Sequence, residues 1–187
     1  MDRSADSKRT RMSDLDLERY WQEAIPWALY LTPTMEQYSL WEAVFRNAVV
    51  PDWAMAAART APLLRLLVIA EDWCGDAANT VPVLARLVEA TPGAELRILA
   101  RDRYQAVMDR YLTNGSRSIP IVIGLDRDFK ELGHWGPRPA ELQAWVVENR
   151  DLPKTHRYPR IRRWYAMDKG EATLRETLAV IRERSGS

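Results

Sequence analysis

The central part of the chain alternates short apolar runs with segments of helical periodicity. Short, nearly continuous apolar runs are typical of buried strands, and three occur here, at residues 63–70, 94–100 and 119–125. A fourth strand is expected at residues 128–135, after a tight turn, and helices at 76–90, 102–112 and 138–149. The order β-α-β-α-β-β-α predicts an α/β fold with a mixed central sheet, because β-α-β gives a parallel pair and β-β an antiparallel one.

Three further helices are expected ahead of this central unit. The first is capped by Ser13 and stopped by Pro26, whose ring is incompatible with a helix interior. The second follows Thr34 and Gln37, which have the spacing of a capping box, and the short third one begins at Pro51.

After the central unit, the chain is expected to continue as a helix that ends at Gly170 and then as a second, amphipathic helix. We therefore predict four segments: a disordered tail, a helical N-terminal extension packed on the core, the core itself, and a helical C-terminal extension. Their bounds are 1–12, 13–62, 63–150 and 151–187.

Composition and charge exclude several classes of function. The net charge of +1 gives no general argument for nucleic acid, and the basic, aromatic stretch at residues 156–165 is interpreted as a solvated helix face. No apolar stretch approaches the roughly 18 residues of a membrane span, so no membrane partner is expected. The N-terminus lacks the apolar region of a secretory signal, and a single cysteine permits no internal disulfide. These features predict a cytoplasmic protein, whereas the oligomeric state stays unknown.

The chain also lacks the motifs of common cofactor sites. No glycine-rich phosphate loop occurs, and no cysteine and histidine have the spacing of zinc ligands. The two histidines, His134 and His156, belong to no metal motif. We therefore expect no metal and no bound cofactor.

The only cysteine, Cys74, follows the first core strand in the sequence EDWCGDAAN. At the start of a helix the free backbone N–H groups favour a thiolate, which is the reactive form of cysteine. Gly75 allows a tight turn, and the large Trp73 can shield one side of the sulfur. Asp76 acts in the opposite direction, because a nearby carboxylate disfavours a thiolate.

A second feature is the sequence SRSIP at residues 116–120, between a helix and a strand. An X-Pro bond at this place is a candidate for the cis isomer, which would leave backbone groups free to pair with an extended peptide. Together with Trp73-Cys74-Gly75 and the order of elements, Ile119-Pro120 resembles thioredoxin over residues 63–150. The segments WCGDAANTVPVL, YLTNGSRSIP, GHWGPRP and RRWYAMDKGEATLRE resemble a bacterial thioredoxin-like family whose members usually read Trp-Cys-Gly-Asp-Cys.

The resemblance implies a three-layer thioredoxin-like fold with Cys74 as the attacking, catalytic cysteine. It implies that Ile119 pairs with the substrate backbone and that Pro120 is a cis-proline facing the cysteine. It also places a set of residues from the loop after the last strand at the border of the site: Gly133, His134 and Trp135. Arg138, next to that loop, could hold a carboxylate.

Two positions depart from the family pattern. Ala77 replaces the second, resolving cysteine, and Val68 replaces the buried acid that thioredoxins carry six residues before the attacking cysteine. Both changes are consistent with a site that does not complete a dithiol cycle. A mixed disulfide at Cys74 would need a low-molecular-weight thiol, as co-substrate, to release it.

Three functions remain open from the sequence, so enzymatic activity is not decided. The first is a thiol-disulfide oxidoreductase that acts through Cys74 alone on a protein or small-thiol disulfide. The second is a redox-inactive thioredoxin-like binding module, which the changes at Ala77 and Val68 favour. The third is a dithiol reductase whose second cysteine has been changed to alanine to trap a mixed disulfide.

Overall fold

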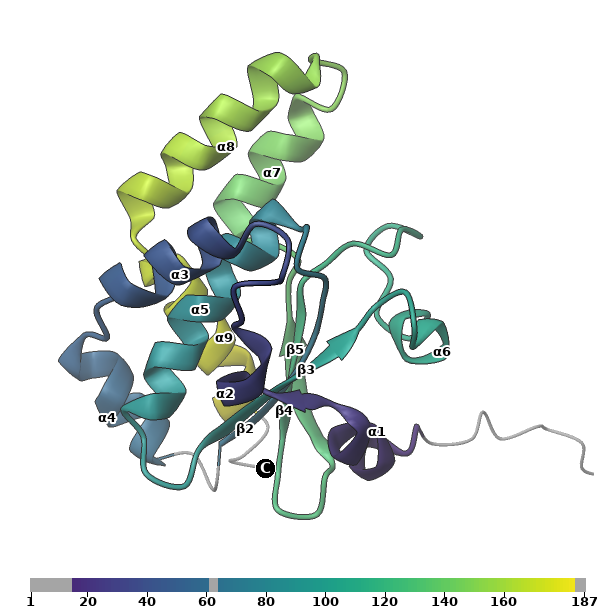
Figure 1. Cartoon of the computed structure of the whole chain (residues 1–187), viewed down its shortest axis with the longest axis vertical. Helices are drawn as coiled ribbons and strands as arrows, with labels where there is room; N and C mark the ends of the chain where they lie inside the picture. The colour runs from purple at the N-terminus through teal and green to yellow at the C-terminus, as the bar shows by residue number, and fades with distance from the viewer. Residues whose placement is uncertain (1–14, 61–63, 184–187) are drawn as a thin grey trace, which may run out of the picture.

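The computed structural model describes residues 15–60 and 64–183 and has a single mixed sheet between two layers of helices (Figure 1). The described strands lie in the order β1-β3-β2-β4-β5. The central strands β2 and β3 are parallel, and the other neighbouring pairs are antiparallel. The strands span Ile25–Pro26, Arg65–Ala70, Glu95–Ala100, Ile121–Leu125 and Glu131–Trp135, numbered β1 to β5. The predicted α/β, thioredoxin-like class with a mixed central sheet is confirmed.

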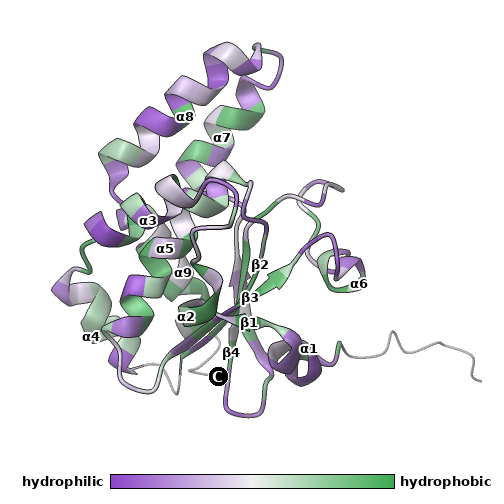
Figure 2. Cartoon of the chain, in the orientation of Figure 1, coloured by the Kyte–Doolittle hydropathy of each residue, from purple (hydrophilic) through white to green (hydrophobic). Residues whose placement is uncertain are grey.

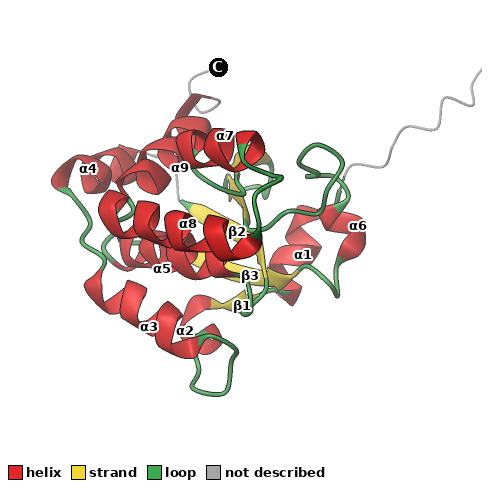
Figure 3. Cartoon of the chain, turned by 90° about the horizontal axis from the view of Figure 1, so that it is seen from above, coloured by secondary structure: helices red, strands yellow, loops and turns green. Residues whose placement is uncertain are grey.

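The helices cover the sheet unequally. Seen from above, α1 and α6 lie on one side of the sheet, and α5 and α9 lie with most of the other helices on the opposite side (Figure 3). The helices span Leu17–Glu23, Trp27–Tyr30, Tyr38–Asn47, Asp52–Thr60, Gly75–Glu89, Gln105–Met108, Ala140–Glu148, Lys154–Asp168 and Glu171–Glu183, numbered α1 to α9.

The buried core explains why the apolar runs form strands. In β2 every residue after Arg65 is buried, and Leu66 to Ile69 are fully shielded from solvent. A strand covered on both faces needs apolar residues at successive positions rather than at alternate ones. Most residues of α5 are buried against this layer, and Figure 2 shows apolar colouring on parts of α5 as well as on other helices such as α2 and α7.

The N-terminal segment differs from the sequence prediction in its details. The proposed cap Ser13 lies outside the described residues, and Asp16 caps α1 by accepting a hydrogen bond from the Arg19 amide at 2.9 Å. No capping box forms at the second helix. Gln37 has left-handed backbone angles there, and its side chain bonds elsewhere. The segment also supplies the edge strand β1, which the sequence analysis did not predict.

Two helices, α7 and α8, project together beyond the sheet (Figure 1). The chain then turns at Gly170, as expected for a glycine with positive φ, and α9 returns to pack against β5 and α5. The helix expected at 102–112 is reduced to the single turn of α6. None of the helices in the described ranges is long and apolar enough to cross a membrane.

Candidate active site around Cys74

Cys74 is the residue that caps the N-terminus of α5. The strand β2 ends at Ala70, and after a short connection α5 begins at Gly75. The backbone of Cys74 is extended and its side chain does not cap the helix by a hydrogen bond, but the backbone N–H groups of Asp76 and Ala77 lower the pKa of its thiol. These are donors that an α-helix leaves without partners in its first turn. The cysteine is 8% exposed, so it is nearly buried at this helix end.

The loop before β4 lies against the sulfur of Cys74. The Cys74 thiol donates a hydrogen bond to the carbonyl oxygen of Ile119 at 3.5 Å, and the Ile119-Pro120 bond is cis. Antiparallel pairing of β2 with β4 matches Ile69 with Ile121, which brings the two chain segments to the same edge of the sheet. The structure therefore joins the two motifs that the sequence singled out.

The environment of Cys74 favours the protonated thiol. Burial raises its pKa above the ordinary value, and the negative charge of Asp76 adds to this effect. The backbone N–H groups of Ala77 and Asp76 and the Arg138 guanidinium lower the pKa, but they do not outweigh burial. The bond from the thiol to Ile119 acts in the same direction as burial, because a thiolate has no proton to donate.

Asp76 belongs to a partly buried cluster directly beside the cysteine. Arg138 lies 2.5 Å from one oxygen of its carboxylate, and the Tyr165 hydroxyl donates to the other at 2.9 Å. Arg138 also donates to the side chain of Gln143 at 3.0 Å. Burial and the Asp76 charge raise the pKa of Tyr165, which therefore stays a neutral donor. The carboxylate that Arg138 holds is thus Asp76, whereas no sequence pattern indicated a role for Tyr165.

The segment before the cysteine is fastened to the N-terminal helices. The indole of Trp41 donates to the Asp72 carbonyl at 2.9 Å, and the Glu36 amide donates to the Asp72 carboxylate at 2.8 Å. The Gln37 side chain donates to the carbonyl of Trp73. Three bonds therefore hold this turn from the α3 side. The Trp73 ring itself is 40% exposed at the surface of the site.

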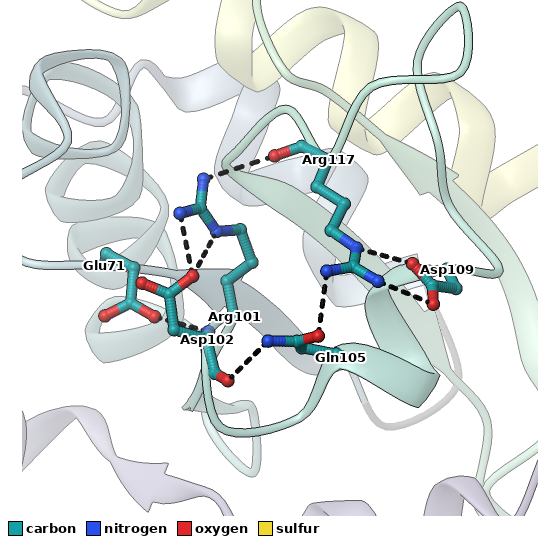
Figure 4. A network of polar contacts seen from close by, with 6 residues as sticks. All are labelled: Glu71, Arg101, Asp102, Gln105, Asp109 and Arg117. Atoms are coloured by element: carbon teal, nitrogen blue, oxygen red, sulfur yellow. Dashed lines mark hydrogen bonds and ion pairs between the residues drawn. The ribbon is translucent and has the colours of Figure 1, made fainter.

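A polar network holds the loop that carries Ile119 (Figure 4). Arg117 forms two bonds with the carboxylate of Asp109, at 2.6 and 2.9 Å, and a third with Gln105 at 2.9 Å. Arg101 donates to the backbone carbonyl of Arg117 at 3.3 Å, and its guanidinium pairs with Asp102 at 2.8 Å. The loop is thus tied to the end of β3 and to α6, which positions the Ile119 carbonyl next to the sulfur.

Cys74 lines a pocket of about 480 Å³ that the helices α3 and α8 partly close. Trp73, Gly75 and Asp76 belong to the same wall as the cysteine, and Ile119 forms the opposite one. The remaining lining residues come from α3, α5, α8 and the loops around the site: Gln37, Leu40, Asn79, Arg101, Arg117, Ser118, Arg138, Tyr158, Ile161 and Arg162. Pro120 is buried and does not line the pocket.

Gly133, His134 and Trp135, which the resemblance placed at the border of the site, do not line this pocket. They belong to β5, where Trp135 and His134 pair with Val122 and Ile123 of β4. Trp135 is buried, and its indole donates to Glu176 at 2.7 Å. Gly133 packs against the backbone of α9, and His134 lines a separate cavity near α1.

The loop that reaches the site begins only after these residues. Gly136 has φ +130, and a Cβ there would lie 2.2 Å from the Pro120 carbonyl oxygen, so only glycine fits. The Gly136-Pro137 bond is also cis, and Arg138 follows with its guanidinium on Asp76. The segment after the last strand therefore does contact the site, but through residues 136–138 rather than the expected residues 133–135.

The two positions that depart from the thioredoxin pattern are both fully buried. Ala77 lies in the first turn of α5, on its buried side, and Val68 lies in the middle of β2. Cys74 is the only cysteine in the sequence, so the chain has no second thiol. Within the described residues, no group of three or more His, Cys, Asp or Glu side chains could hold a metal ion.

Comparison with known proteins gives a family and a fold. Residues 24–156 match the family model described as Thioredoxin, whereas no curated protein matches the chain. A crystal structure of a protein of unknown function from Pseudomonas aeruginosa is 19% identical with a TM-score of 0.70, covering 88% of this chain and 95% of that one. A crystal structure of an HIV epitope-scaffold is 20% identical with a TM-score of 0.70, covering 91% and 98%. At these identities the two likenesses show the fold alone.

Proposed function

The chain belongs to the thioredoxin family, and we propose that it catalyses thiol-disulfide exchange through Cys74 alone. One arrangement carries this proposal. The only cysteine of the chain lies at the N-terminus of α5, lines a pocket, and faces the Ile119 carbonyl beside a cis-proline. The N-terminus of a helix is where thioredoxin-type cysteines react, because the free backbone N–H groups favour a thiolate there.

The proposed first step uses a protein cysteine that carries a small thiol as a mixed disulfide. The Cys74 thiolate attacks the sulfur of the small thiol, forming a new sulfur–sulfur bond and breaking the old one. The protein cysteine leaves as a thiolate and takes up a proton from solvent. The exchange is neutral in electrons, because one disulfide replaces another.

The second step requires a free small thiol, because Ala77 cannot displace the adduct. The thiolate of a second small molecule attacks the adduct, forms a small-molecule disulfide and returns Cys74 to its free form. We therefore also propose that the protein works in the cytoplasm, where small thiols are kept reduced.

The test is a peptide that carries glutathione on a single cysteine. With free glutathione present, the wild-type protein should release peptide thiol over many turnovers. Without it, release should stop after one equivalent, with the glutathione adduct on Cys74 visible by mass spectrometry. Cys74→Ser should show only the uncatalysed rate, and catalysis that persists in this variant would refute the proposal.

Ala77→Cys sharpens the same test, because it restores a second thiol one helical turn from Cys74. The adduct could then be displaced within the protein, which forms a disulfide between Cys74 and the introduced cysteine and releases glutathione. Without added glutathione, the adduct on Cys74 should therefore not accumulate, and free glutathione should appear instead; many turnovers would require an added reductant such as dithiothreitol. Ala77 is fully buried, and Ala77→Ser gives a matched control of similar size without a thiol.

A redox-inactive binding module is the second candidate, and a specific observation favours it. The pKa of Cys74 is raised, and its thiol is engaged with the Ile119 carbonyl, so little thiolate exists at neutral pH. The pH dependence of alkylation under native conditions separates the two functions. A cysteine that stays unreactive until the protein unfolds would support the binding module.

A further inference from the structure

Four arginines line the Cys74 pocket, but three of them are already neutralised. Arg138 is paired with Asp76, Arg117 with Asp109, and Arg101 with Asp102, at 2.5, 2.6 and 2.8 Å. These ion pairs also hold loops in place, so their guanidiniums serve the architecture of the site.

Arg162 is the fourth arginine, and its guanidinium has no ion-pair or hydrogen-bond partner among the described residues. It lies on α8, next to Ile161 and one turn after Tyr158, which line the same pocket. No acidic residue precedes Asp168 in this helix. Its cationic residues form no ion pair with any described residue, and they are Lys154, Arg157, Arg160, Arg162 and Arg163. Their combined positive potential favours an anion at the α8 wall of the pocket.

The dimensions of the pocket favour a small molecule. A volume of about 480 Å³ falls within the range of small-ligand sites. Its walls offer apolar surface from Trp73 and Ile161, a reactive sulfur, and the unpaired charge of Arg162. A ligand that matches all three has a thiol or disulfide sulfur, a short stem and a carboxylate.

We propose that Arg162 binds a carboxylate of the small thiol that exchanges at Cys74, so that anionic low-molecular-weight thiols are the preferred substrate class. The identity of the reacting sulfur rests on the function proposed above. The anion site itself does not, since it depends only on Arg162 and the shape of the pocket.

The experiment measures binding without chemistry. S-methylglutathione has two carboxylates and a capped sulfur, so it can occupy the pocket but cannot form a disulfide. We expect saturable binding by calorimetry or by a change in tryptophan fluorescence, to which Trp73 in the same pocket contributes along with the other seven tryptophans. Arg162→Gln should weaken binding about fivefold, as expected for the loss of one exposed charge contact. Arg162→Lys should keep part of the affinity.

Two controls separate the local contact from general charge. Arg163→Gln removes a neighbouring exposed cation that lines the cavity between α7 and α8 instead, and it should leave the affinity within about twofold of wild type. S-methylglutathione with esterified carboxylates should bind weakly to the wild type and be insensitive to Arg162→Gln. Raised salt should weaken the wild type more than the Arg162→Gln variant.

The outcomes keep this inference apart from the proposed function. Absence of saturable binding to the wild type, or equal affinity for the wild type and Arg162→Gln, would overturn the anion site. An equal loss in Arg163→Gln would overturn it too, because the effect would then be general charge. If binding behaves as expected while Cys74 forms no mixed disulfide, the exchange function fails and the anion site stands.

Discussion

Two clusters in this molecule each combine a carboxylate, a tyrosine and a basic side chain, but they lie in different surroundings. Asp76 accepts a hydrogen bond from the Tyr165 hydroxyl and pairs with Arg138. Glu131 accepts one from the Tyr111 hydroxyl at 2.8 Å and pairs with His134 at 2.6 Å. In both clusters burial and the neighbouring carboxylate raise the pKa of the tyrosine, which stays a neutral donor.

The difference is what each cluster faces. Asp76 and Arg138 act on Cys74 with opposite signs, because the carboxylate raises the pKa of the thiol and the guanidinium lowers it. Glu131 and His134 line a separate cavity with residues of α1 and with Tyr111. The first cluster therefore adjusts the reactivity of the cysteine, whereas the second joins β5 to the segment after α6. Apart from Gly136→Ala, each of the variants below changes one member of one cluster.

Asp76→Asn should have the largest effect. Removing the carboxylate lowers the pKa of Cys74, and Arg138 then acts on the thiol without compensation, so alkylation near neutral pH should be several-fold faster. The variant should also lose about 2 kcal/mol of unfolding free energy, because an arginine with only 20% of its side chain exposed is left unpaired. Alkylation rates and denaturant unfolding measure the two effects.

Glu131→Gln is the matched control in the second cluster. It should leave the alkylation rate of Cys74 within twofold of wild type, since Glu131 does not line the pocket of the cysteine. Faster alkylation in both variants would show that loss of any buried carboxylate loosens the fold, and the specific role of Asp76 would be lost.

Arg138→Gln should act in the opposite direction and more weakly. The guanidinium is a smaller influence on Cys74 than the Asp76 carboxylate, and its removal should raise the pKa of the thiol further. Alkylation near neutral pH should be slower by about twofold to several-fold, and the rate should keep rising to higher pH than in the wild type. A pH–rate profile distinguishes this result from simple unfolding, which would make the cysteine react faster.

Most of the sheet could be predicted from the sequence, because its strands have a strong apolar pattern. The strands β2 and β4 are buried on both faces almost throughout, which gives continuous apolar runs. The strand β3 is interrupted by the half-buried Arg97, but its apolar residues are still numerous enough to indicate a strand. The strand β1 has two residues, Ile25 and Pro26, and so short a strand has no periodicity to detect. It exists because β3 offers an edge for pairing, which is a tertiary cause.

From the sequence, only those site residues that belong to a short local motif could be predicted. Cys74 and Ile119 could be found because their motifs are local, and strand pairing joins them. Tyr165 and Arg162 come from α8, about 90 residues after the cysteine, and their chemistry depends on how a projecting helix folds back over the pocket. No pattern within α8 indicates that contact, since the same sequence would also suit a solvated helix.

The tyrosine pair gives the next smaller effect. Tyr165→Phe and Tyr111→Phe each remove one hydrogen bond to a carboxylate and should each lower the unfolding free energy at neutral pH by about 1 kcal/mol. Both native pKa values are raised, so the unfolded chain loses its tyrosine protons first, and stability falls as pH rises above about 10. Each variant should therefore lose less stability than the wild type over that alkaline range. Only Tyr165→Phe should also change the alkylation rate of Cys74, because only Tyr165 contacts Asp76.

His134→Gln should have the smallest effect of all on Cys74. The resemblance to thioredoxin placed His134 at the border of the site, but its side chain is 50% exposed in the other cavity, against Glu131 and the ring of Tyr111. We expect the rate of thiol exchange to stay within twofold of wild type, and stability to fall by less than about 1 kcal/mol, as for the loss of one partly exposed side-chain hydrogen bond. Exchange with the glutathione-bearing peptide measures the first quantity, and denaturant unfolding the second. Gly136→Ala, two residues after His134, tests the same loop where it meets the site and should slow exchange, because its Cβ would displace the Pro120 carbonyl. If His134→Gln slowed exchange and Gly136→Ala did not, the contact between the last strand and the active site would lie where the family resemblance put it.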